Sequence, residues 1–130
     1  MRKRFLSVMA GVIAGFITVS IGDGITQYLY PANGLNYADK EALKDFISQL
    51  PNACFAMMLS FWCLSSFIGG LVAGRVDPKT WLHSSILTGL ILLAASVGNL
   101  VMIPYHPNWM MVSCIILYLP LAYLGGKLVN

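Results

Sequence analysis

Four long apolar runs restrict the possible folds of this 130-residue chain more than any other feature of its sequence. A helix of about 20 apolar residues is long enough to cross a hydrocarbon layer roughly 30 Å thick. We predict membrane-spanning helices over residues 5–30, 52–74, 80–103 and 108–127. Only 10% of the residues are charged, whereas about a quarter are charged in a water-soluble domain. The sequence therefore predicts an all-α membrane protein, with one four-helix domain over residues 1–130.

Lysine and arginine residues gather near the ends of the predicted spans and indicate how the helices cross the membrane. If the N-terminus is cytoplasmic, only Lys40 and Lys44 of the eight basic residues lie outside. The residues on the cytoplasmic side are then Arg2, Lys3, Arg4, Arg75, Lys79 and Lys127. Cytoplasmic loops are normally enriched in basic residues, so we predict that both termini lie in the cytoplasm. The small net charge of +3 falls at these helix ends and does not indicate a nucleic-acid partner.

Residues 37–50, between the first two spans, have the pattern of a short amphipathic helix. Apolar residues recur at helical spacing and charged residues occupy the other face. The apolar residues are Leu43, Phe46, Ile47 and Leu50. A helix of about 20 Å is too short to cross the membrane. We expect it to lie on the outer membrane surface with its apolar face down; the alternative is a lid over the mouth of the bundle.

Small residues recur every three or four positions in three of the spans. They let helix backbones approach closely, which matters in lipid because no hydrophobic force drives helices together there. The residues that we expect to pack helices are Gly11, Gly15, Gly22, Ser66, Gly70, Gly74, Ser85 and Gly89. These positions are more numerous than one four-helix bundle needs, so we expect some of them to face partner proteins.

Asp23 is the only acidic residue within the four predicted spans. An ionisable side chain costs free energy in lipid, so such residues are functional candidates by default. The tetrapeptide Ser20-Ile21-Gly22-Asp23 has a near copy 76 positions later, Ser96-Val97-Gly98-Asn99, and a proline follows each copy at the same distance. A carboxylic acid and a carboxamide therefore occupy matching places in the first and third spans.

A second internal match relates the other two spans, because residues 67–70 resemble residues 123–126 at an offset of 56. The two matches predict two tandem helical hairpins in parallel orientation, with the surface helix inserted into the first hairpin. Proteins built from such repeats pack them about an axis along the membrane normal.

The predicted spans bring five polar residues to a similar depth. At 1.5 Å per residue, Asp23 and Asn99 lie about 7–9 Å below the outer boundary. We predict a polar cluster near the outer side of the bundle, formed by Asp23, Gln27, Ser60, Asn99 and Ser113. The alternative is that Asp23 makes only an interhelical hydrogen bond, for example to Asn99.

Several short motifs, most of them after the first span, are also found together in a known family. They are Tyr30-Pro31, Gly34-Leu35, Glu41-Ala42-Leu43, Leu50-Pro51, Gly69-Gly70 with Ala73, Asn99, Met102-Ile103-Pro104, His106-Pro107, Trp109 and Leu124-Gly125-Gly126. Through them the chain resembles a family of uncharacterised small bacterial membrane proteins with four predicted helices. The resemblance implies the same fold, a location in a bacterial inner membrane and no particular activity. Family members tend to carry an acid and a histidine late in the first helix; the acid here is Asp23, but Gln27 or Tyr28 stands in place of the histidine.

The sequence contains no nucleophile–base set, phosphate-binding loop or cluster of metal ligands, so we expect neither an enzyme nor a cofactor or metal site. Cys54, Cys63 and Cys114 lie within spans without a Cys-x-x-Cys motif, and we interpret them as small packing residues. We predict an accessory or structural subunit of a larger membrane assembly, in contact with lipid and with other subunits or itself. The alternative is a small homo-oligomeric transporter or channel that uses Asp23 and Asn99 in an outer-leaflet polar site.

Overall fold

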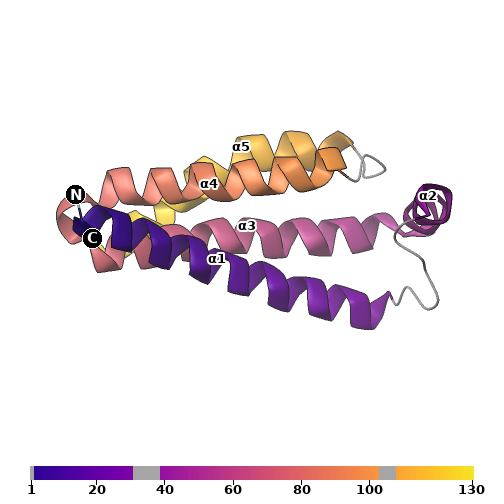
Figure 1. The fold of residues 1–130 in the computed structure, drawn as a ribbon, viewed down its shortest axis with the longest axis horizontal. Helices are drawn as coiled ribbons and strands as arrows, with labels where there is room; N and C mark the ends of the chain where they lie inside the picture. Colours follow the sequence, from indigo (N-terminus) through magenta and orange to yellow (C-terminus); the bar gives the residue numbers. More distant parts are fainter. Residues whose placement is uncertain (1, 31–38, 103–107) are drawn as a thin grey trace.

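The computed structural model describes residues 2–30, 39–102 and 108–130, and all of its regular structure is helical. The elements are α1 (Arg2–Leu29), α2 (Lys40–Gln49), α3 (Asn52–Val76), a 3-10 turn η1 (Pro78–Thr80), α4 (Trp81–Met102) and α5 (Asn108–Leu128). The four long helices run lengthwise through the molecule, both termini lie at one end, and α2 lies at the other end (Figure 1). The predicted start of the surface helix at residue 37 and the predicted end of the third span at residue 103 fall outside the described residues.

The four long helices are long and apolar enough to cross a membrane, as the sequence predicted. Their central member is α3, which packs against α1, α4 and α5, while α1 also contacts α4. In Figure 1, α1 lies close to α4 near the N-terminus and diverges from it toward the α2 end. This divergence leaves the halves of α1 and α4 nearest α2 apart.

The packing of α3 against α5 is close enough to leave no room for side chains at the contact. A Cβ atom on Gly70 would lie 2.2 Å from the carbonyl oxygen of Ala122, and one on Gly74 would lie 2.9 Å from Cα of Gly126. Both pairs are separated by 52 positions, so the two helices run in the same direction. Small residues at a spacing of four allow this approach.

The small-residue positions predicted from the sequence all lie at helix contacts within this chain. A Cβ on Gly11 would meet α3 and α4, one on Gly15 would meet Leu92, and one on Gly22 would meet Phe61. Gly89 lies against Ala122. The hydroxyl of Ser66 donates to the carbonyl oxygen of Tyr118, and that of Ser85 donates to the carbonyl oxygen of Gly70. The surplus of small residues that we expected to face partners is therefore used inside the bundle.

The spatial registers of the helices can be compared with the two offsets of the sequence repeat. Gly11 lies against Thr88 and Gly15 against Leu92, so α1 and α4 run in the same direction at an offset of 77, one position from the sequence offset of 76. In contrast, α3 and α5 pack at an offset of 52 and not 56. This difference of one helical turn shifts the second pair by about 6 Å along the axis. The origin of the chain by tandem duplication stays a prediction.

Helix α2 begins after Asp39, whose carboxylate accepts hydrogen bonds from the backbone N–H groups of Glu41 (3.1 Å) and Ala42 (3.3 Å). This is the usual way in which an aspartate caps a helix. The apolar face of α2 is directed toward the protein, because Ile47 is only 5% exposed and belongs to the hydrophobic core. The partly buried Leu43, Phe46 and Leu50 pack against the same core.

Candidate functional site

The five residues of the predicted polar cluster lie on all four long helices. Asp23 and Ser113 are half-buried, and Gln27, Ser60 and Asn99 are exposed. Ser60 donates its hydroxyl hydrogen to the carbonyl oxygen of Ala56 in its own helix, at 2.8 Å. Ser113 belongs to α5, whose close contacts are with α3 and α4. Among the described residues, no hydrogen bond joins any two of the five side chains.

Trp62 of α3 is the residue that links Asp23 to the interior of the bundle. Its side chain is 2% exposed, and its indole N–H lies beside the carboxyl group of Asp23. The indole nitrogen has no hydrogen bond of good geometry among the described residues. We therefore describe the contact between Asp23 and Trp62 as electrostatic and not as a well-formed hydrogen bond.

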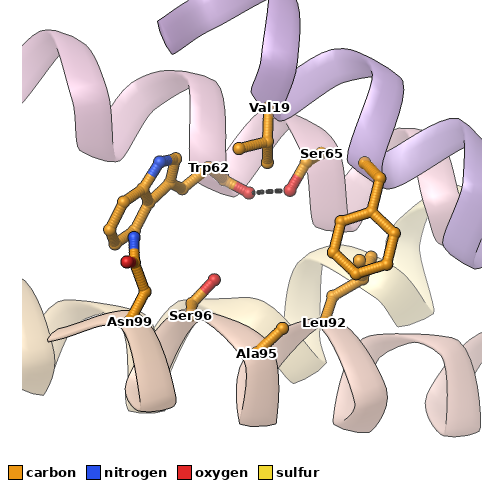
Figure 2. A pocket seen from close by; sticks show the side chains of 8 residues that line it. Val19, Trp62, Ser65, Leu92, Ala95, Ser96 and Asn99 are labelled. Atoms are coloured by element: carbon orange, nitrogen blue, oxygen red, sulfur yellow. Dashed lines mark hydrogen bonds between the residues drawn. The ribbon is translucent and has the colours of Figure 1, made fainter. Parts of the chain in front are cut away.

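A crevice of about 160 Å³ lies beside Trp62, between α1, α3 and α4. Its lining residues are Phe16 and Val19 from α1, Trp62 and Ser65 from α3, and Leu92, Ala95, Ser96 and Asn99 from α4. Figure 2 shows the Ser96 hydroxyl directed into the crevice and the Asn99 carboxamide directed toward the Trp62 ring. A tryptophan and an asparagine thus form its polar edge.

Asp23 lies beyond the lining residues of this crevice, on the same face of α1. It follows Phe16 by seven positions and Val19 by four, so the three side chains share one face of α1. Across the crevice, Leu92 and Asn99 are separated by the same seven positions on α4. Continued along both helices, the register of Gly11 with Thr88 and of Gly15 with Leu92 matches Asp23 with residue 100. Asp23 and Asn99 are therefore within about 1.5 Å of the same level along the two helices.

A buried pair of hydroxyl groups connects the crevice to α5. The Ser96 and Tyr118 hydroxyl oxygens are 2.7 Å apart, which is hydrogen-bonding distance. Tyr118 is fully buried. Ser65, on the opposite side, donates its hydroxyl hydrogen to the carbonyl oxygen of Trp62, as Figure 2 shows. These two hydrogen bonds pair the hydroxyl groups of Ser65, Ser96 and Tyr118. The bond between Ser96 and Tyr118 joins α4 to α5 beside the crevice.

Sequence reasoning did not identify Trp62 or Tyr118 as members of this site. A signal was present for Trp62, because tryptophan in membrane proteins is enriched at the interface with water, and this one is ten residues inside α3. Its N–H group usually needs a partner when buried. Tyr118 carried no comparable signal, since its role depends on the contact between α4 and α5.

Asp23 contacts the Trp62 N–H, and among the described residues the side chains of Gln27 and Asn99 make no hydrogen bond. All three lie on α1 and α4, the two helices that diverge. Polar groups in the apolar part of a bilayer are normally paired or in contact with water. The opening between α1 and α4 therefore holds polar side chains that lack a well-formed hydrogen bond in the described structure, inside candidate membrane spans.

The fold and this crevice define the class: an integral membrane protein with four candidate membrane-spanning helices. No protein-family model, curated protein or solved structure matches the chain. The resemblance to small bacterial four-helix proteins therefore stays a prediction. Within the described ranges, no three side chains of the histidine, cysteine, aspartate or glutamate type gather as metal ligands would.

Proposed function

We propose that this protein is a non-catalytic accessory or structural subunit of a larger membrane assembly. The observation that carries the proposal is that, among the described residues, Gln27 and Asn99 have no hydrogen-bond partner at the opening between α1 and α4, and Asp23 contacts the Trp62 N–H without a well-formed hydrogen bond. An isolated charge at the centre of a bilayer costs about 3 kcal/mol on insertion scales, and less near the boundary. A protein surface seated on this opening would supply partners and remove part of that cost.

The positions of two glycines also favour a partner protein at the opening between α1 and α4. Of the glycines in the described helices, Gly24 and Gly98 are the two at which an added Cβ would meet no atom within 4 Å. They are the direct neighbours of Asp23 and Asn99. Positions that allow close helix approach therefore remain free beside the unsatisfied polar side chains, where a partner helix would gain both contacts.

We also propose that the protein lies in a bacterial inner membrane with both termini in the cytoplasm. Both termini are at one end of the bundle (Figure 1), and this end carries exposed basic side chains. These side chains are Arg2, Lys3, Arg4, Arg75, Lys79 and Lys127. Enrichment of basic residues on the cytoplasmic side supports this orientation.

Purification in a mild detergent or in native lipid discs tests the proposed role. The expected result is a particle heavier than the 14.2 kDa chain and its lipid, with companion proteins in fixed ratio. Asn99→Leu and Asp23→Leu should lower the yield of companions, whereas Ile116→Leu, on an exposed part of α5, should not. A monomeric particle without companions would contradict the proposal.

A small homo-oligomeric transporter or channel that uses Asp23 and Asn99 is the second candidate. The half-buried carboxyl group of Asp23 favours it, because acidic residues within candidate membrane spans often mark ion and proton pathways. The test is solute or proton flux into liposomes that contain the purified protein. Flux that is lost in Asp23→Asn, with the protein still folded, would favour this candidate; no flux above that of empty liposomes would contradict it.

A further inference from the structure

We propose that the opening between α1 and α4 binds a second copy of this chain, with Asp23 of each copy paired to Asn99 of the other. This inference deepens the proposed function by naming one partner. It rests on the proposed function in one respect: the opening is taken to be a surface for protein contact. Other companions of the assembly are independent of it.

The depth of the two residues makes this pairing geometrically available. A two-fold dimer whose copies cross the membrane in the same direction has its axis along the membrane normal, so each residue meets residues of equal depth in the other copy. The α1–α4 register places Asp23 opposite residue 100, one position from Asn99. When two such openings face each other, α1 of one copy lies against α4 of the other, which brings the carboxyl group and the carboxamide together.

The chemistry of the two side chains is complementary: Asn99 makes no hydrogen bond with another described residue of its own chain, and Asp23 contacts the Trp62 N–H with acceptor capacity left over. An ionised carboxylate only accepts hydrogen bonds, whereas a carboxamide offers two N–H donors. Within one chain the two groups share no hydrogen bond, and the buried ring of Trp62 lies beside both. A two-fold axis would form the pair twice, so one contact type would satisfy four groups.

The backbone on both sides of the opening can accept close approach by another helix. α1 presents Ser20, Gly24 and Gln27, which are all exposed, and α4 presents Ala95 and Gly98. Neither glycine has a neighbouring atom where a Cβ would stand. Helix interfaces in membranes are enriched in such small residues because van der Waals contact drives the association.

The buried indole N–H of Trp62 supplies a second observation at the same place. It lies beside the Asp23 carboxyl group but lacks a hydrogen bond of good geometry in the described structure. A carboxylate has room for several donors. In the dimer, Asp23 would be held by Asn99 of the second copy on one side and by the Trp62 N–H of its own chain on the other.

Cysteine cross-linking between differently tagged copies tests the pairing. The background has Cys54, Cys63 and Cys114 replaced by alanine, and one copy carries Gly24→Cys while the other carries Gly98→Cys. Oxidation in native membranes should join the two tags, because only cysteines with Cα atoms within about 7 Å form a disulfide readily. The control pair, Gly24→Cys with Ile115→Cys on the exposed face of α5, should give about tenfold less product under the same geometric limit.

Exchange of the polar groups tests whether Asp23 and Asn99 meet. Asn99→Asp places two carboxyl groups opposite each other and should lower the cross-link yield about tenfold, the effect of one to two lost interhelical hydrogen bonds. The double variant Asp23→Asn with Asn99→Asp restores complementarity and should restore the yield. A double variant that stays as low as the single one would overturn the pairing, and far-ultraviolet circular dichroism would show that each variant is folded.

The failure of this inference can be separated from failure of the proposed function. If the two tags are not joined but the native particle keeps its companions, the opening does not bind a second copy and the accessory role stands. If the tags are not joined and the native particle is a monomer, both are wrong. Capture of a small molecule in the opening, seen as protection of Gly98→Cys from a thiol reagent without cross-linking, would also overturn the second-copy pairing.

Discussion

The carboxyl group of Asp23 on α1 lies beside the buried indole N–H of Trp62 on α3, although the indole nitrogen has no hydrogen bond of good geometry. Trp62 also lines the crevice with Asn99. The Trp62 ring therefore lies beside both the acid and the carboxamide, for which the sequence suggested a direct hydrogen bond. The pairing of the two residues within one chain is not made.

Replacement of Trp62 should separate the contribution of the indole's buried volume to stability from that of its N–H group. We expect Trp62→Phe to change the free energy of unfolding by less than about 1.5 kcal/mol, because it keeps most of the buried volume and removes an unpaired donor. Trp62→Ala should cost about 3–5 kcal/mol through the cavity it leaves. Unfolding of the detergent-solubilised protein, followed by circular dichroism, measures both. Equal losses for the two variants would mean that the N–H group makes a bond that matters.

The contact between α3 and α5 should be sensitive to a single added side chain. Gly70→Val would place its Cβ on the Ala122 carbonyl group, and overpacking of this kind costs about 1–3 kcal/mol or more. Gly98→Ala is the matched control, since a Cβ there meets no atom within 4 Å. It should leave the monomer as stable as the parent chain. The midpoint of thermal unfolding compares them, and similar midpoints for both variants would contradict the close packing of α3 on α5.

Two serines of α3 provide a comparison between a bond across helices and a bond within one helix. Ser66 is buried and donates to the Tyr118 carbonyl oxygen at 2.6 Å, and we expect Ser66→Ala to cost about 0.6–1.7 kcal/mol. Ser60 is exposed and bonds only to its own helix, so Ser60→Ala should have almost no effect. Unfolding in mixed micelles measures the difference, and an equal loss for both serines would refute it.

The hydroxyl pair of Ser96 and Tyr118 should show energetic coupling. A double-mutant cycle with Ser96→Ala and Tyr118→Phe isolates their interaction because both replacements keep the shape of the side chain closely. We expect a coupling free energy of about 0.5–1.5 kcal/mol for a neutral buried hydrogen bond. Strict additivity of the two single variants would show that the 2.7 Å contact contributes nothing. Ser113→Ala with Tyr118→Phe serves as the control cycle, for which we expect no coupling.

Hydrophobic run length alone predicted the four long helices, and the helical spacing of apolar residues predicted α2 with Ile47 on its apolar face; that this face packs against the protein core came from the structure. Both patterns are local, because each depends only on the apolar and polar residues of a single helix. The small-residue positions such as Gly11 and Gly70 also followed from spacing. The sequence repeat gave an offset within one position of the α1–α4 register.

The composition of the polar site depended on the tertiary structure. The sequence predicts how deep each residue lies in the membrane but not the direction in which its side chain points. Ser60 and Ser113 therefore do not reach Asp23, although we expected all three at a similar depth. The choice of α3 as the central helix, the one-turn shift between α3 and α5, and the divergence of α1 from α4 all arise from contacts between distant residues. Those contacts placed Trp62 beside Asp23, because close backbone approach at a few glycines fixes the rotation of each helix about its axis. The hydropathy of the sequence does not determine that rotation.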